Sequence, residues 1–247
     1  MGRLIAISNR TAADPSARAG GLAVAVWESL KSSGGVWFGW SGDIAERQSR
    51  SVQSLKDDGV EFVLTDLTER EHDQYYLQYA NSVLWPVFHY RLDLAAFNSD
   101  AFQVYAAVNQ RIANIVTERL RDGDTVWVHD YHFLLMGDSM RRAGWDGPIG
   151  FFLHVPFPAI EALRAVPGYE YLLRSLCAYD VLGFHTERDL RAFKTCLDEP
   201  IVDAKIISNN VIELAGGRLI ADVYPIGVDV GEIQALSAEA DTTKAVR

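Results

Sequence analysis

Polar or charged side chains come directly after several apolar stretches of this chain. The residues in question are Arg10, Asp130, His154 and His185. An arginine can bind a phosphate through two parallel hydrogen bonds, and a carboxylate can accept hydrogen bonds from sugar hydroxyl groups. The pair Gly20-Gly21 precedes a predicted helix, where backbone N–H groups can meet a second anion, although a glycine pair can equally serve only as a turn. Together these residue types indicate recognition of a phosphorylated, hydroxyl-rich ligand.

His154 lies in the stretch IGFFLHVPFP, residues 149–158. The apolar run before it is typical of a strand buried on both faces, as in the centre of a parallel sheet. The strand must end there, because the two prolines of VPFP have no N–H to donate to a neighbouring strand. Ligands of open α/β sheets bind at this carboxyl edge. A lone histidine could also be structural, but the polar groups after other strands favour a site.

Predicted strands and helices alternate along the chain, which indicates an α/β fold with a Rossmann-like, doubly wound, mostly parallel sheet. The predicted strands are 4–8, 36–40, 61–65, 125–128, 149–153, 180–184 and 223–227, with a hairpin within 201–220 that turns at Gly216-Gly217. The predicted helices are 22–32, 68–80, 101–121, 134–142, 159–165, 169–178 and 186–197. Right-handed crossovers place the carboxyl ends of parallel strands at one edge, so the polar side chains should meet there.

The segment that begins at Thr68 is rich in aromatic residues. Thr68 and Glu71 form a capping box for a helix, and Trp85-Pro86 predicts an extended loop after it. Adjacent tyrosines such as Tyr75 and Tyr76 cannot both face one core, but the sequence does not say which one points elsewhere. Aromatic faces can bind sugars, and ordinary core packing explains these residues equally well.

Composition excludes several classes of protein. The 247 residues carry a formal net charge of −10, which argues against a nucleic-acid or anionic-membrane partner. We find no apolar run long enough to span a membrane and no signal-peptide pattern. The two cysteines, Cys177 and Cys196, fall in predicted helices, so we expect reduced thiols and a cytoplasmic location.

Neither a cofactor nor a metal is expected. The sequence has no G-x-G-x-x-G and no G-K-[ST], so neither a dinucleotide-binding fingerprint nor a P-loop is indicated. A metal site from His129, Asp130, His132 and His154 is an alternative. We disfavour it, because the turn H-D-Y-H points its side chains in different directions and metal geometry needs convergence.

The chain resembles the N-terminal half of the trehalose-6-phosphate synthases. The motifs that carry the resemblance, in chain order, are SNR, AGGL, WFGWSG, YYLQYANSVLWPVFHYR, WVHDYH, GFFLHVPFP, LGFHT and VYPIG. Each motif is weak alone, but their order and spacing are specific and cover nearly the whole chain. Members of that family are retaining, two-lobed (GT-B) glycosyltransferases that transfer glucose from UDP-glucose to glucose 6-phosphate. The resemblance therefore implies the N-terminal, acceptor-binding lobe of such an enzyme.

The resemblance also implies roles for particular residues. Those that match the glucose 6-phosphate pocket are Arg10, Tyr76, Trp85 and Asp130, with Trp40 near the sugars. Gly20 and Gly21 match a loop beside the donor diphosphate, and His154 matches a histidine over the donor glucose. His154 and Asp130 are the residues we expect at the reacting centre. The implied front-face mechanism needs no enzyme nucleophile, so they act through orientation and charge rather than as general bases.

The chain departs from the family pattern after the motif VYPIG. We expect residues 1–237 to form the acceptor-binding lobe and residues 238–247 to be a truncated connection to an absent nucleotide-sugar lobe. In the family that second lobe supplies an arginine and a lysine that bind the donor diphosphate. Since leaving-group stabilisation is mostly electrostatic, the isolated chain should turn over little or nothing. A face left uncovered would favour homo-oligomers.

Two other functions fit the same residues. The first is a sugar-phosphate-binding module without catalytic activity. The second is a related transferase that uses GDP- or ADP-glucose, because donor choice resides mainly in the second lobe. The first predicts saturable glucose 6-phosphate binding with no turnover even when a C-terminal lobe is supplied in trans.

Overall fold

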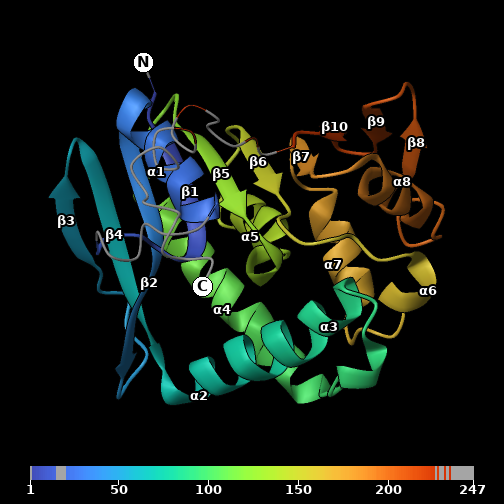
Figure 1. Cartoon of the computed structure of the whole chain (residues 1–247), viewed down its shortest axis with the longest axis horizontal. Helices are drawn as coiled ribbons and strands as arrows, with labels where there is room; N and C mark the ends of the chain where they lie inside the picture. The colour runs from blue at the N-terminus through green and yellow to red at the C-terminus, as the bar shows by residue number, and fades with distance from the viewer. Residues whose placement is uncertain (1, 15–20, 226, 228–230, 232–233, 235–247) are drawn as a thin grey trace, which may run out of the picture.

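A mixed sheet forms the centre of the molecule (Figure 1). The computed structural model describes residues 2–14, 21–225, 227, 231 and 234. Within these residues the sheet has 10 strands in the order β3-β4-β2-β1-β5-β6-β7-β10-β9-β8. The strands are β1 (Leu4–Arg10), β2 (Gly35–Ala45), β3 (Gln53–Asp57), β4 (Val60–Thr68), β5 (Thr125–His129), β6 (Ile149–Phe152), β7 (Val181–Phe184), β8 (Ala204–Ile206), β9 (Val211–Leu214) and β10 (Gly217–Val223).

The central strands are all parallel, as the alternating pattern predicts. The strands β4, β2, β1, β5, β6, β7 and β10 pair in parallel, and antiparallel pairing is confined to β3 on one side and to β9 and β8 on the other. The edge strand β3 was not predicted, because its residues QSLKD are all exposed and show no apolar alternation. The predicted Rossmann-like, doubly wound architecture is confirmed.

Helices cover both faces of the sheet (Figure 1). The helix α1 (Gly21–Ser33) packs Val26, Trp27 and Leu30 on one face, against Ala6 of β1. Ile5 and Ile7 of the same strand point to the larger core on the opposite face. The helices that enclose this larger core include α4 (Ser99–Thr117), α5 (Met136–Arg142), α7 (Tyr169–Leu176) and α8 (Glu187–Cys196).

The aromatic segment is a continuous helix rather than a helix followed by a loop. The predicted capping box is present, since the Glu71 N–H donates to Thr68 Oγ1 (3.2 Å) and the Thr68 N–H donates to Glu71 Oε2 (2.9 Å). The chain then passes through α2 (Glu69–Glu71), a π-helix η2 (His72–Leu84) and α3 (Trp85–Phe88).

The extended step predicted at Trp85-Pro86 is therefore wrong, because both Leu84 and Trp85 have helical dihedral angles. The wide π-helical turn accommodates the proline, since the Trp85 N–H reaches back to the Ala80 carbonyl. Pro86 has no N–H to donate, and the nearby Ser82 carbonyl instead accepts from the Ala96 N–H (2.8 Å).

The C-terminal part of the sheet also differs from the prediction. The hairpin is confirmed, because β9 and β10 pair antiparallel around Gly216. A separate final strand at 223–227 is wrong: β10 ends at Val223, and Ile226 lies outside the described residues. The same strand β10 pairs with β9 on one side and, in parallel, with β7 on the other. A strand that serves both the hairpin and the parallel sheet leaves no need for another.

The proposed connection, residues 238–247, lies outside the described residues, so the division at residue 237 stays a prediction. Within the residues that are described, no helix has the length and apolar character needed to cross a bilayer. The short helices not yet named are η3 (Leu92–Leu94), η4 (Tyr131–Phe133) and α6 (Ile160–Leu163).

Candidate functional site

Four neighbouring strands deliver the predicted polar residues to one edge of the sheet. In the order β1-β5-β6-β7, these strands run parallel and end at or just before Arg10, Asp130, His154 and His185, respectively. The structure links two of them directly, because the His154 N–H donates to Asp130 Oδ1 (3.3 Å). The rings of His154 and His185 lie 5.8 Å apart. The convergence expected from right-handed crossovers is therefore present.

The glycine pair is only partly described. Gly20 lies outside the described residues, whereas Gly21 is the first residue of α1. Because α1 leads back from the carboxyl end of β1 to the start of β2, its N-terminus lies at the same edge as Arg10. Whether the pair meets a diphosphate stays a prediction.

Arg10, Trp40 and Tyr76 form one side of the site, which we call the arginine side. The Arg10 guanidinium carbon lies 4.9 Å from the centroid of the Trp40 ring, at a distance typical of a cation–π contact. The Trp40 ring lies 5.6 Å from that of Tyr76. The Trp40 indole N–H donates to the Asp43 carbonyl (2.8 Å), which fixes the orientation of the ring. An exposed cation beside aromatic faces suits a sugar phosphate.

The structure decides between the adjacent tyrosines. Tyr75 is buried, and its hydroxyl donates to Asn9 Oδ1 (3.0 Å). Tyr76 is half-buried, and its ring stacks on that of His132 (5.7 Å) and lies 5.6 Å from that of Trp40. Tyr76 therefore faces the site and Tyr75 belongs to the core, a choice that the sequence left open.

Trp85 has its ring contact outside the arginine side. Its side chain is 41% exposed, and its ring stacks on that of His89 (4.2 Å). Among the described residues, no ring contact joins Trp85 to Trp40 or Tyr76. Its role in binding glucose 6-phosphate stays a prediction.

His129, Asp130 and His154 form the other side of the site, which we call the imidazole side. His129 Nδ1 and His154 Nε2 are 3.1 Å apart, so the two rings share a hydrogen bond. Burial lowers the pKa of His154 to about 4 with a further contribution from His185, and burial together with His154 lowers the pKa of His129 well below its ordinary value. Both imidazoles are therefore neutral at pH 7.

Asp130 has an unusual backbone and an unusual acidity. Its φ of 72° is positive, which costs a residue with a side chain about 1–3 kcal/mol and is frequent at functional sites. The Asp130 N–H donates to the Phe152 carbonyl (2.8 Å), which helps to hold this conformation. Burial raises the pKa of Asp130 to about 6, against the opposing effect of hydrogen bonds from the Tyr131 and His154 backbones. The carboxylate is ionised at pH 7 and available as an acceptor.

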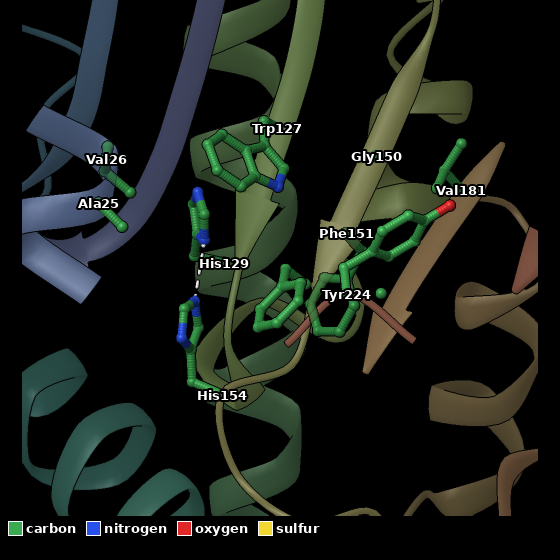
Figure 2. Close-up of a pocket in the computed structure, with 11 residues that line it drawn as sticks. Ala25, Val26, Trp127, His129, Gly150, Phe151, His154, Val181 and Tyr224 are labelled. Carbon is green, nitrogen blue, oxygen red and sulfur yellow. Dashed lines mark hydrogen bonds between the residues drawn. The ribbon is translucent and has the colours of Figure 1, made fainter. Parts of the chain in front are cut away.

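A cavity of about 320 Å³ adjoins the imidazole side (Figure 2). Figure 2 shows the rings of His129 and His154 end to end, with Trp127 on one side and Ala25 and Val26 of α1 on the other. The walls are mostly apolar. The residues that line this cavity include neither Arg10 nor Tyr76, so the arginine side is not part of it.

The four residues of the metal hypothesis do not converge. His132 stacks against Tyr131 (4.2 Å) and Tyr76 (5.7 Å), whereas His129 pairs with His154. Within the described ranges, no group of three or more His, Cys, Asp or Glu side chains is placed to hold a metal ion.

Sequence reasoning missed one contributor to the arginine side, His72, and one contact near the site, made by Asn81. His72 lies 5.3 Å from Trp40 and 5.6 Å from Tyr76, ring to ring. Its position four residues before Tyr76 on one helix could have revealed it. Asn81 accepts a hydrogen bond from the Tyr131 hydroxyl (2.9 Å) and so ties η2 to the segment after β5. No local sequence signal predicts that long-range contact.

Comparisons with known proteins cover nearly the whole chain. A sequence model described as glycosyltransferase family 20 matches residues 6–247. The chain is 41% identical over 239 residues to a trehalose-6-phosphate synthase of Enterobacter sp. (strain 638), covering 95% of this chain and 50% of that protein. It is 42% identical over 240 residues to the trehalose-6-phosphate synthase of Cronobacter sakazakii, covering 96% of this chain and 50% of that protein.

Solved structures agree with the fold. An Escherichia coli structure bound with UDP-2-fluoro glucose superposes with a TM-score of 0.90 at 40% identity, covering 99% of this chain and 53% of the other. A UDP-forming α,α-trehalose-phosphate synthase from Burkholderia xenovorans, in complex with glucose-6-phosphate, gives a TM-score of 0.90 at 42% identity, covering 100% and 54%. The chain thus spans about half the length of these relatives. With a match over nearly all its residues and the same fold, the chain belongs to glycosyltransferase family 20.

Proposed function

We propose that the chain is the acceptor-binding lobe of a retaining glycosyltransferase. In this proposal the complete enzyme makes α,α-trehalose 6-phosphate from UDP-glucose and glucose 6-phosphate. The observation that carries it is the meeting of Arg10, Asp130 and His154 at adjacent strand ends, beside the aromatic rings of Trp40 and Tyr76. The named functions of the relatives support the choice of substrates.

The two sides of the site would bind different parts of the substrates. Arg10 would bind the phosphate of glucose 6-phosphate, with Trp40, Tyr76 and Trp85 beside its sugar. Asp130 would accept hydrogen bonds from a sugar hydroxyl, which its ionised carboxylate at pH 7 allows. The remaining residues would serve the donor: His154 would contact the donor glucose, and Gly20 and Gly21 would lie beside its diphosphate.

The proposed chemistry makes few demands on these residues as acids or bases. The bond from the donor glucose to the diphosphate breaks, a bond to an acceptor hydroxyl forms on the same face, and the hydroxyl proton goes to the departing phosphate oxygen. His154 is neutral and His129 is buried, so neither is placed as a cationic acid at pH 7. His154 and Asp130 would act by orienting the sugars and by stabilising developing positive charge.

The proposal includes a cytoplasmic location for the protein. Cys177 and Cys196 are free thiols, and burial raises the pKa of each to about 12. Thiols of this kind are unreactive, as expected for a protein of the reducing cytoplasm.

Calorimetric titration of the chain with glucose 6-phosphate tests the binding part of the proposal. We expect saturable binding, with glucose and inorganic phosphate as separate, weaker controls. Equal affinity for free phosphate and glucose 6-phosphate would contradict a built acceptor site. A coupled assay for UDP release tests catalysis by this chain alone, for which we expect little or no turnover.

A specific observation also favours a second candidate, a sugar-phosphate-binding module. The arginine side is formed entirely by residues of this chain, which spans about half of its relatives. Addition of a relative's C-terminal lobe in trans separates the two functions. Turnover in the mixture supports the transferase, whereas binding without turnover supports the module.

A further inference from the structure

His129 is the residue of the imidazole side to which the proposed function gives no task. It is the last residue of β5, its side chain is 1% exposed, and its Nδ1 lies 3.1 Å from His154 Nε2. Its other ring nitrogen, Nε2, is buried and has no hydrogen-bond partner among the described residues. A buried histidine with one nitrogen engaged and one unpaired has only a small choice of proton positions.

The contact between the two rings requires one donor and one acceptor. If His129 donates from Nδ1, then His154 accepts at Nε2 and must carry its own proton on Nδ1. If His154 donates from Nε2 instead, then His129 must carry its proton on Nε2. The two arrangements place opposite groups on the side of His154 that faces away from His129: an N–H donor in the first, a lone pair in the second.

The unpaired nitrogen of His129 decides between these arrangements. The first leaves a buried acceptor without a partner, whereas the second leaves a buried N–H without one. A buried N–H without an acceptor is rarer in folded proteins than a buried acceptor without a donor, and leaving either one unpaired costs free energy. This difference favours the first arrangement, in which both rings give up the Nε2–H form that free histidine favours.

We propose that His129 is a positioning residue that holds His154 in its Nδ1–H tautomer, so that His154 presents an N–H donor to the ligand. That the ligand atom is a hydroxyl oxygen of the donor sugar rests on the proposed function. The tautomer itself is inferred from the contact between the two rings and from the unpaired His129 nitrogen, without reference to a ligand.

The main chain of His154 is held from the same strand end. Asp130, the next residue after His129, accepts the His154 N–H at Oδ1 (3.3 Å), and its own N–H donates to the Phe152 carbonyl (2.8 Å). Phe152 also packs against the His154 ring (4.7 Å). Figure 2 shows the two imidazole rings end to end along this edge, joined by the dashed hydrogen bond. The end of β5 thus holds both the backbone and the ring of His154.

Nuclear magnetic resonance of the ring nitrogens tests the proposal on the chain as it exists. In protein labelled with ¹⁵N-histidine, long-range ¹H–¹⁵N correlations distinguish protonated from unprotonated ring nitrogens, and single substitutions assign the 6 histidines. We expect Nδ1–H and bare Nε2 for His154 at pH 7, and Nδ1–H for His129. An Nε2–H tautomer or a doubly protonated ring at His154 would overturn the proposal.

Two substitutions of His129 separate the hydrogen bond from packing. In His129→Leu the dominant tautomer of His154 should switch to Nε2–H, the form that free histidine favours. In His129→Asn the side-chain amide replaces the Nδ1–H donor, so His154 should keep its proton on Nδ1. An unchanged His154 tautomer in His129→Leu would refute a positioning role.

The outcome is independent of whether the substrates are assigned correctly, since no ligand enters the measurement. Trp127→Phe serves as a packing control, because Trp127 contacts the His129 ring (4.2 Å) without taking part in the hydrogen bond. Its His154 tautomer should match that of the unmodified chain, and a switch there would also count against the proposal. If His129→Leu fails to fold, the spectrum of the unmodified chain and that of His129→Asn still decide the question.

Discussion

The site has two sides: the arginine side, with Arg10, Trp40 and Tyr76, and the imidazole side, with His129, Asp130 and His154. The two sides differ in how far their charged and titratable groups are exposed to water. On the arginine side an exposed, permanently charged group lies over an aromatic face. On the imidazole side the polar groups are shielded from water, and the pKa values of both histidines fall while that of Asp130 rises.

The difference reflects what each side can recognise. An arginine at the surface remains hydrated, so its charge has a small desolvation cost. It can bind the negatively charged phosphate of a ligand. Neutral imidazoles in a drier environment suit hydroxyl groups, since hydrogen bonds are stronger where water competes less. In the proposed function, the same edge of one sheet would offer an exposed cation to the phosphate, and neutral imidazoles with the ionised Asp130 carboxylate to sugar hydroxyls.

The largest expected effect comes from breaking a buried ion pair at the start of η2, the helix that carries Tyr76. Arg111 and Glu71 are buried and form a paired contact, with Nε to Oε1 and Nη2 to Oε2 distances of 3.0 Å each. Arg111→Ala leaves the Glu71 carboxylate buried without its partner, so the free energy of unfolding should fall by about 3–5 kcal/mol. Urea denaturation measures the change. The exposed pair of Arg50 with Glu118 is the matched control, and Arg50→Ala should cost less than about 1 kcal/mol.

Removal of the Arg10 cation should affect ligand binding rather than the stability of the fold. Arg10→Ala should weaken glucose 6-phosphate binding by about 100-fold, or about 3 kcal/mol, because two charge-assisted hydrogen bonds are lost. Its unfolding free energy should change little, since Arg10 is exposed. Calorimetric titration measures the affinity. Arg142→Ala, which alters an exposed arginine paired with Asp138, should bind like the unmodified chain; equal affinity for Arg10→Ala would exclude Arg10 from the site.

The imidazole side should make the free energy of unfolding depend on pH. Burial raises the pKa of Asp130 from 3.8 to about 6, so the folded state binds its proton more tightly than the unfolded state does. The stability that this group contributes is full below pH 3.8 and is lost as the pH rises through 6. Asp130→Asn removes this loss. Relative to the unmodified chain, it should gain about 2 kcal/mol between pH 4 and pH 7.5 in urea denaturation.

Asp124 provides a control of opposite sign. Burial raises its pKa, but hydrogen bonds from Arg3 and from backbone N–H groups outweigh burial and lower it below 3.8. Asp124 therefore contributes stability above pH 3.8 that is lost as the pH falls through its lower folded pKa. Asp124→Asn should be least stable, relative to the unmodified chain, near neutral pH. The same pH trend in both variants would contradict the assigned environment of Asp130.

The smallest effects distinguish the adjacent tyrosines. Tyr75→Phe should lower the free energy of unfolding by about 1 kcal/mol, because Asn9 Oδ1 loses a buried hydrogen bond, and it should leave ligand affinity unchanged. Tyr76→Phe keeps the ring and should leave stability almost unchanged. Tyr76→Ala should weaken glucose 6-phosphate binding several-fold, since a sugar loses an aromatic face. Unfolding curves and calorimetric titrations on the three variants provide the measurements, and the reverse pattern would exchange the two assignments.

Much of this arrangement was predictable from the sequence, because it depends on local patterns. Apolar runs that end in Arg10, Asp130 and His154 mark strand ends, and the handedness of crossovers brings such ends to one edge. The capping box at Thr68 likewise depends only on residues three positions apart. Each of these features is determined by residues that are close together in the sequence.

The remaining features were decided by tertiary structure. The proline at position 86 lies inside a helix because a π-helical turn and the distant Ala96 N–H accommodate it. The pairing of His129 with His154 depends on the register of β5 and β6, which aligns His129 with Phe152. Local sequence determines where a strand ends and which residue ends it. Which rings then touch, and which nitrogen carries the proton, follows from the packing of segments far apart in the chain, where burial and the available partners set the energies.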